Sequence, residues 1–504
     1  MKKKRSIGLL LSYGNTFFNM ICGLLLSSFI LRRLGDTEYG IYQTMSSFAN
    51  YLVLFEFGTG TVLTRNLSAS RARGESKETI EKNISTIWTI TAFLSAVILA
   101  VSIAFYFSIP FVYSNTLNPE QIEQGKKIFV AIIIFLISTF FCQTLNGIAL
   151  ANEHYTFSSS VSILRLITRT TLLIVLLLKW KNSLIIAIVD SLIGLIIAVF
   201  TYIYCRRAFH VKINFKGFDR FILKASLPLC LALFLQTIVN QSNNSVGKFV
   251  LGVMSGPEDV ALYSVALYVF GIFSSLSTIP LSLYVPQVTK DVMSGLEGLS
   301  LTKTLIQPCR LIVLVSGSVL FGFVACGRQF VDIVYGKDYS LAWLMAIILI
   351  MPSFLNMSNS VILNVLDAKN KRIVRSWFLM ITTAINIVLT ILGIKYFGII
   401  AAAAATGIAT ILQVVIMNIY YQKAIRIKVM YLFKHIFKGI LPYQILAALL
   451  GYLSGAFISN MLVSFLVAGI TYVIVFVMCF SVFGKNEEEK LLFKNFVRKL
   501  KKSK

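Results

Sequence analysis

The sequence predicts an all-α membrane protein that crosses the bilayer many times. Of its 504 residues, 57% are hydrophobic and only 13% are charged, about half the charged fraction of an average soluble protein. The mean hydropathy is +0.79. Apolar segments of ~20 residues recur from end to end, and each is long enough to cross ~30 Å of hydrocarbon. This chain cannot be a soluble helical protein, because it has too few polar residues to cover so many apolar helices.

Fourteen apolar segments are predicted as transmembrane spans, and no connection between them is long enough for a soluble domain. The basic N-terminus resembles a signal peptide, but no small-residue cleavage site follows, so an uncleaved first span is expected. Pro280 and Pro286 are expected to kink the eighth span. The approximate limits are 7–31, 40–64, 85–109, 127–150, 155–178, 183–204, 225–250, 260–286, 304–326, 340–365, 373–395, 397–421, 437–457 and 460–484.

The basic residues predict the direction of these spans. With the N-terminus in the cytoplasm, 34 of the 47 Lys and Arg residues lie on the cytoplasmic side, 9 lie outside and 4 lie within spans. Cytoplasmic loops of membrane proteins carry such an excess. The pattern therefore predicts an even number of spans, with both termini in the cytoplasm.

The net charge and the cysteines exclude other classes of function. The net charge is +26, and most of the basic residues lie on one membrane face, where anionic lipids attract them. We therefore expect no nucleic-acid partner. The basic tail over 485–504 is expected to form an amphipathic helix on that face or to be disordered. The seven cysteines are scattered, without a CxxC motif, which predicts no disulfide framework and no metal site.

An internal repeat divides the chain. The segment GDTEYGIYQT (35–44) precedes GPEDVALYSV (256–265) by 221 residues, and ANEHYTFSSS (151–160) precedes AKNKRIVRSW (368–377) by 217. Each half contains six spans, so both halves enter the membrane in the same direction, as in transporters with two equivalent lobes around a cavity. The predicted divisions are a six-helix lobe over 1–220, a second over 221–430, and helices 13 and 14 with the basic tail over 431–504.

In the order and content of several segments, the chain resembles the polysaccharide-export flippases of the multidrug/oligosaccharidyl-lipid/polysaccharide superfamily. The segments that carry the resemblance are LRRLGDTEYGIYQ (31–43), GTGTVLTRNLSASRARG (58–74), KFVLGVMSGPEDVALYSVALYVFG (248–271), ILNVLDAKNKRIV (362–374) and NIVLTILGIKYFGIIAAAAATGIAT (386–410). The resemblance implies two six-helix bundles that form a V around a central cavity. It also implies a substrate, an oligosaccharide on undecaprenyl pyrophosphate that is turned from the inner to the outer leaflet.

Further expectations follow from the resemblance. It implies a non-enzymatic protein of the bacterial cytoplasmic (inner) membrane, without a cofactor, that works by alternating access in O-antigen, capsule or exopolysaccharide biosynthesis. Its partners would be the lipid-linked oligosaccharide, membrane lipids, and a polysaccharide polymerase with export machinery. Coupling to a sodium or a proton gradient stays open, because Gly247 stands where family members often have an acidic residue.

A flippase needs a wet, positively charged cavity, because a pyrophosphate and sugar hydroxyls are costly to place in hydrocarbon without partners. Arg165 and Arg169 lie near mid-bilayer on one face of the fifth span, where a charge usually faces a cavity or a partner. Asp190 of the sixth span is at nearly the depth of Arg169. We therefore expect a structural Arg169–Asp190 ion pair and assign Arg165 to the substrate anion.

Amide side chains are the second group of cavity candidates, since each amide both donates and accepts hydrogen bonds with sugar hydroxyls. The alternative is that they join helices to one another. Asn15 and Asn19 belong to the first span. The matching stripe of the seventh span contains Gln236, Asn240, Asn243 and Asn244.

Two further groups of residues have assignments of their own. Arg32 and Arg33, at the outer end of the first span, either extend to lipid headgroups or form a rim that receives the pyrophosphate. Asn240, Asn386 and Thr406 together would make an oxygen-rich cation site, since some relatives have a sodium site among corresponding helices.

Three rival functions remain to be weighed. A drug or cation antiporter of the same superfamily would need deep carboxylates, and the deep spans offer only Asp190 and Glu56 against two arginines. A membrane enzyme would need a large outer loop or a cluster of acidic, His or Arg residues, which the sequence lacks. A lipid II flippase is the closest rival, and the residues of the sequence distinguish it poorly from a polysaccharide-export flippase.

Overall fold

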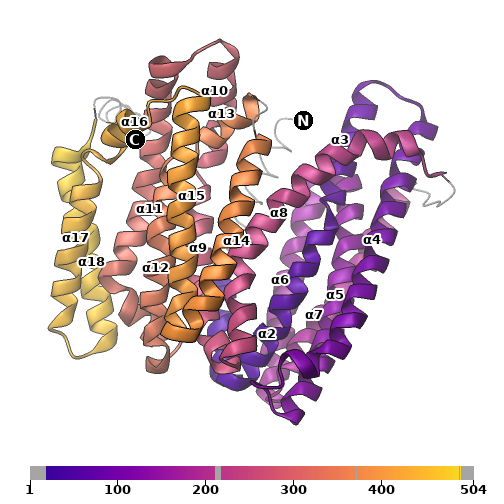
Figure 1. Ribbon diagram of the computed structural model, residues 1–504, viewed down its shortest axis with the longest axis horizontal. Coiled ribbons are helices and arrows are strands. Elements are labelled where there is room, and N and C mark those ends of the chain that lie inside the picture. Colours follow the sequence, from indigo (N-terminus) through magenta and orange to yellow (C-terminus); the bar gives the residue numbers. More distant parts are fainter. Residues whose placement is uncertain (1–18, 210–216, 370–371, 487–488, 490–504) are drawn as a thin grey trace, which may run out of the picture. The chain divides into compact units, whose positions relative to one another are not determined.

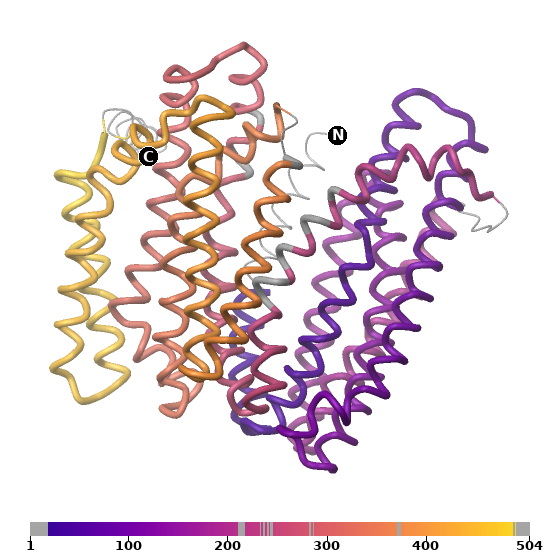
Figure 2. Tube along the Cα trace, viewed as in Figure 1, coloured from indigo at the N-terminus to yellow at the C-terminus, as the bar shows by residue number. Residues whose placement is uncertain are grey.

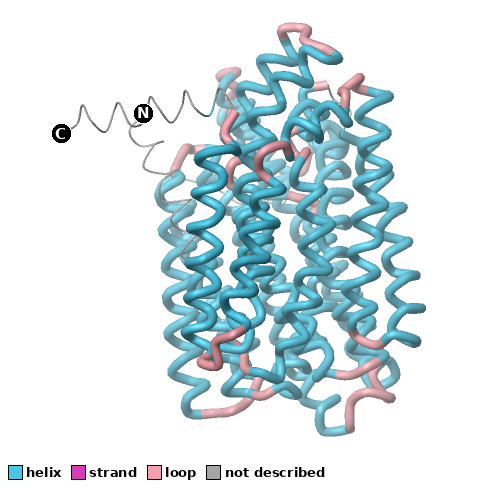
Figure 3. Tube along the Cα trace, turned by 90° about the vertical axis from the view of Figure 1, so that its left-hand side faces the viewer, coloured by secondary structure: helices cyan, strands magenta, loops and turns pink. Residues whose placement is uncertain are grey.

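The computed structural model describes residues 19–209, 217–369, 372–486 and 489, and all regular structure in these ranges is helical (Figure 1). Within α8, α10 and α14 the backbone alone is described for some positions, including Gln236, Asn240, Asn243, Asn244 and Pro286. Loops join the helices mainly at their ends (Figure 3). The predicted all-α class is confirmed.

The helices follow one another with short connections. Residues 19–34 are helical. They are followed by α2 (Asp36–Leu52), η1 (Val53–Glu56), α3 (Thr59–Ala72), α4 (Lys77–Val112), α5 (Pro119–Ala151), α6 (Tyr155–Lys179), α7 (Leu184–Phe209), α8 (Arg220–Met254), α9 (Pro257–Thr278) and α10 (Leu281–Met293). The rest are α11 (Gly298–Val334), η3 (Lys337–Tyr339), α12 (Ser340–Ser358), α13 (Ile362–Ala368), α14 (Arg372–Phe397), α15 (Ile400–Ala424), α16 (Val429–Phe437), α17 (Leu441–Ala456), α18 (Met461–Cys479) and η4 (Phe480–Gly484).

Ten of the described helices are long and apolar enough to cross a membrane, and α16 with α17, bent by 45°, makes an eleventh. The predicted count of fourteen is not confirmed, because three of the predicted spans are not among these eleven. The span over 7–31 begins in residues outside the described ranges, the span over 225–250 falls in α8, where some side chains are not described, and the span over 40–64 is broken. The eighth predicted span also breaks, at Pro280, where α9 gives way to α10.

The break in the second span comes from two consecutive left-handed residues. Phe57 has φ 50° and Gly58 has φ 64°, so α2 continues only through the short η1 before α3 starts on a new axis. The Phe57 ring stacks on Phe234 of α8, with centroids 4.4 Å apart. Left-handed conformation is costly for a residue with a side chain, and this aromatic contact helps to hold Phe57 in place.

The described chain divides into two compact units. The first contains residues up to Ser264 with Thr390–Ile399, and the second contains Val265–Leu389 and the remainder to the C-terminus. α8 belongs to the first unit because it packs along α2 (Figure 2). The predicted lobes over 1–220 and 221–430 rest on the internal repeat, which this division does not test, and their arrangement around a cavity stays a prediction.

Small residues bring helices of the first unit close together. Added Cβ atoms would lie 2.6 Å from the Gln143 carbonyl oxygen at Gly60 and 2.5 Å from the Gly60 carbonyl oxygen at Gly147. The Thr64 hydroxyl crosses the same contact and donates to the Gly147 carbonyl (3.1 Å). Such close approach is typical of helix packing in membranes, and it fixes α3 against α5.

One carboxylate joins three segments at the end of the first unit where α2 begins. Glu38 accepts hydrogen bonds from the Gln124 amide (2.7 and 2.9 Å), and from the backbone N–H (2.8 Å) and hydroxyl (2.7 Å) of Ser183. These donors belong to α5 and to the connection between α6 and α7. The charged acceptor makes each of these bonds stronger than a neutral one.

In the second unit, Arg310 of α11 ties several elements together. It is 3% exposed, and it donates two hydrogen bonds to the Glu489 carboxylate, at 2.9 and 3.0 Å. Its remaining N–H groups donate to the carbonyls of His435, Lys438 and Gly484, at 2.7–3.0 Å. α17 and α18 pack side by side on α11 (Figure 1), so Arg310 lies where the last two spans meet the rest of this unit.

Candidate functional site

A polar pocket of about 250 Å³ lies between α5, α6 and α7 of the first unit. It is lined by Thr139, Cys142, Gln143, Asn146, Phe157, Ser158, Val161, Ser162, Arg165, Ile197 and Thr201. The three helices are membrane spans, so amide, hydroxyl and guanidinium groups gather here in the apolar part of the protein. Polar groups at this depth are costly unless they serve packing or a ligand.

Arg165 supplies the charge of this pocket. Its guanidinium carbon lies 5.0 Å from the centroid of the Phe135 ring, a favourable but modest interaction. In the described ranges, no Asp or Glu oxygen lies within 4.0 Å of Arg165. Arg165 is ten residues from the start of α6 at Tyr155, which places it ~15 Å along the helix. The side chain can thus offer its N–H donors to an anion.

Arg169, one turn further along α6, has a different environment. It donates to both oxygens of Asp190, at 2.5 and 3.0 Å, which is the bidentate geometry of a strong ion pair. The Tyr42 hydroxyl donates to the same carboxylate at 3.4 Å. The pair that the sequence favours is therefore present in the structure, and it joins α6 and α7 to α2.

A second polar chain lies between α2 and α8. The Lys248 ammonium donates to the Gln43 side chain at 3.3 Å, and the Gln43 amide donates to the Tyr39 hydroxyl at 2.7 Å. Lys248 is one of the four basic residues within the predicted spans, and the sequence assigns it no role. The signal that could have found it is a lone lysine in the apolar run SVGKFVLG. Unlike Arg165 and Arg169, Lys248 is only two residues from the end of its predicted span at residue 250, so it lies near the outer end of that span.

The two arginines that end the first span have different surroundings. Arg33 donates to the carbonyl oxygens of Leu177 (2.9 Å) and Leu178 (2.6 Å). It therefore satisfies carbonyls at the C-terminus of α6, which lack helical partners. These two hydrogen bonds account for the position of Arg33, and the headgroup contact and the substrate rim stay predictions. Arg32 is exposed.

Replacing Arg33 with alanine should destabilise the protein by about 1 kcal/mol, because two charge-assisted bonds to a partly exposed helix end are lost. Thermal unfolding in detergent measures this, with the exposed Lys181→Ala as control. Transport per folded molecule should stay unchanged. A transport defect at unchanged stability would support the rim role instead.

Most amide candidates are outside the parts that the structure describes. Asn15 lies outside the described residues, and the side chains of Gln236, Asn240, Asn243 and Asn244 are not described. Asn19 is exposed at the first described position. Their assignment to the cavity stays a prediction.

Two members of the predicted cation site are neighbours in the second unit. The Thr406 hydroxyl donates to the Asn386 side-chain oxygen at 3.4 Å, and both residues are buried. The same hydroxyl lies 3.1 Å from the Ala402 carbonyl oxygen. The third member is Asn240, whose side chain is not described. The site with all three residues therefore stays a prediction.

Comparison with known proteins decides the family. Residues 8–290, more than half of the chain, match the family described as "Polysaccharide biosynthesis protein". The chain belongs to this family. A relative in Haloferax volcanii, described as a probable low-salt glycan biosynthesis flippase, Agl15, is 26% identical over 186 residues. That match covers 36% of this chain and 38% of the relative, so the chain spans little more than a third of the relative's length.

Solved structures share the fold of this member of the polysaccharide biosynthesis family. The lipid II flippase MurJ, in an inward closed conformation, has a TM-score of 0.72 at 16% identity, over 93% of this chain and 98% of MurJ. An inward-facing MATE multidrug transporter of the MOP superfamily has a TM-score of 0.59 at 13% identity, over 83% and 96%. A MOP transporter of Pyrococcus furiosus, with a binding pocket described as having reverse polarity, has 0.52 at 12%, over 84% and 94%.

Proposed function

We propose that this protein is a flippase that moves undecaprenyl-pyrophosphate-linked oligosaccharide repeat units from the cytoplasmic to the outer leaflet, for O-antigen, capsule or exopolysaccharide biosynthesis. Its site would be the bacterial inner membrane, with both termini in the cytoplasm, and its lobes would alternate in access. The family match and the glycan flippase relative support the class. A polysaccharide polymerase and export machinery would then take the product.

The observation that carries the proposal is the Arg165 pocket. A guanidinium with no carboxylate within 4.0 Å among the described residues, surrounded by amides and hydroxyls, offers complementary groups to a phosphate and to a sugar. Flipping breaks no bond, so such a site needs only to replace water around the polar head. Of the two carboxylates that the deep spans offer, Asp190 is already bound by Arg169, which makes it unsuited to a cationic substrate and disfavours a drug or cation antiporter.

Reconstitution tests this function directly. The full chain is placed in liposomes that contain a lipid-linked oligosaccharide with a fluorescent sugar, and a membrane-impermeant quencher reports the molecules in the outer leaflet. We expect the quenched fraction to rise beyond that of protein-free liposomes as inner-leaflet molecules emerge. Labelled lipid II and a fluorescent organic cation, each in parallel liposomes, are the comparisons. Transport of lipid II alone, or of an organic cation alone, would contradict the proposal in favour of the corresponding rival.

A further inference from the structure

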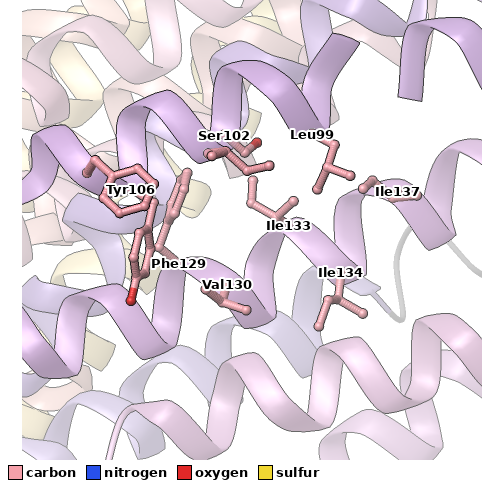
Figure 4. A pocket seen from close by; sticks show the side chains of 10 residues that line it. Leu99, Ser102, Tyr106, Phe129, Val130, Ile133, Ile134 and Ile137 are labelled. Carbon is pink, nitrogen blue, oxygen red and sulfur yellow. The ribbon is translucent and has the colours of Figure 1, made fainter. Parts of the chain in front are cut away.

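A groove of about 340 Å³ lies between α4 and α5, separate from the Arg165 pocket (Figure 4). It is lined by Leu99, Ser102, Ile103, Tyr106, Phe107, Phe129, Val130, Ile133, Ile134 and Ile137. Tyr106 and Phe129 lie at one end, and Leu99 and Ile137 at the other. The Ser102 hydroxyl donates to the Ile98 carbonyl at 2.7 Å. The groove therefore presents hydrocarbon along nearly all of its length.

The rims of the groove face away from the protein. Phe107 is 74% exposed, and Ile103 and Val130 are about half exposed, at 51% and 46%. Both helices are apolar membrane spans, so these side chains meet lipid rather than water. The surrounding bilayer can supply an occupant from the side, and an apolar chain is the occupant that the lining favours.

A cation lies at one end of the groove. The Lys126 ammonium is 5.3 Å from the centroid of the Tyr106 ring, and Tyr106 is part of the lining. Lys126 lies one helical turn before Phe129, just outside the segment 127–150 that the sequence predicts to be in hydrocarbon. Within the described ranges Lys126 has no carboxylate within 4.0 Å, whereas Lys127 pairs with Glu123 at 3.8 Å. Lys126 is thus at headgroup level and available to a phosphate.

We propose that this groove with Lys126 is a binding site for an anionic phospholipid, with one acyl chain in the groove and the phosphate on Lys126. The charge at one end and the apolar channel below it complement the two parts of such a lipid. The lining offers a glycan almost no hydrogen-bonding groups, which favours a phospholipid over the lipid-linked sugar as the occupant. The site does not depend on the proposed transport activity.

Native mass spectrometry of the delipidated full-length protein tests the site. Phosphatidylglycerol and phosphatidylcholine with identical acyl chains are titrated, and bound lipids are counted. We expect about five-fold tighter binding of phosphatidylglycerol at one site, the effect of one favourable cation–headgroup interaction. Lys126→Gln should abolish this preference. Val130→Trp should fill the groove and weaken binding of both lipids at that site.

Matched variants separate the site from general lipid adhesion. Lys127→Gln removes an adjacent charge, and Val199→Trp adds the same bulk at an exposed position of α7. Both controls should bind lipid like the unmodified protein. The proposal would be overturned if Lys126→Gln and Lys127→Gln showed the same preference for phosphatidylglycerol. It would also be overturned if the two tryptophan variants bound lipid equally well. Displacement of phosphatidylglycerol by an equal concentration of undecaprenyl phosphate would overturn it too, and would identify the carrier lipid as the occupant.

Discussion

Replacing Arg165 with alanine should lower the rate of lipid-linked oligosaccharide transfer by about ten- to a hundred-fold. This is the effect of losing one charge-assisted hydrogen bond between the guanidinium and a phosphate. The measurement is the initial rate of fluorescence quenching in proteoliposomes, normalised to the amount of inserted protein. Arg165→Lys should keep part of the rate, because lysine preserves the charge but not the planar donor geometry.

The same variant should remain folded. Arg165 contacts the Phe135 ring and has no ion-pair partner among the described residues, so its removal leaves no opposite charge uncompensated. Leu164→Ala, at a neighbouring lipid-exposed position of α6, is the matched control for side-chain truncation. A normal transfer rate for Arg165→Ala would remove this residue from the mechanism, and a large fall in melting temperature would assign it a structural role.

Replacing Arg310 with alanine should have the largest effect on stability, about 3–5 kcal/mol, which is typical of breaking a buried ion pair. The change strands the Glu489 carboxylate and three backbone carbonyls that now accept from Arg310. Thermal unfolding in detergent measures the loss. Hydrogen exchange should show that protection is lost first in α17 and α18, since Arg310 joins their ends to α11.

Three variants make the Arg310 prediction specific. Arg328→Ala removes an exposed arginine from the same helix and should leave the melting temperature nearly unchanged. Arg310→Lys should be almost as unstable as the alanine variant, because an ammonium cannot make five bonds in a fixed plane. Glu489→Gln should cost less, since the amide oxygen still accepts. Equal stability of Arg310→Ala and Arg328→Ala would contradict this interpretation.

The fold class and one ion pair could be predicted from the sequence because both follow from simple counting. Hydrophobic segments of membrane length give the helices, and a fixed rise per residue gives the depths at which Arg169 and Asp190 meet. The break at Phe57 could not be predicted in this way. Glu56 and Gly58 flank it, but glycine also occurs inside unbroken helices such as α5, and the contact with Phe234 of α8 is remote in the chain.

The roles of Arg33 and Arg310 were missed for a different physical reason. Most of their acceptors are backbone carbonyls at helix ends, and every residue type carries a carbonyl. No side-chain pattern marks such partners, so only the folded chain identifies them. Lys248 was visible as a lone charge, but its neighbour Gln43 belongs to α2, some two hundred residues earlier.

The Glu38 carboxylate has a consequence for biogenesis. One of its donors, Ser183, is synthesised 145 residues after Glu38. While the ribosome is still producing the intervening helices, α2 cannot complete its contacts at that end, because Ser183 has not yet been made. The first half of the protein therefore finishes assembling only after the connection between α6 and α7 has been translated.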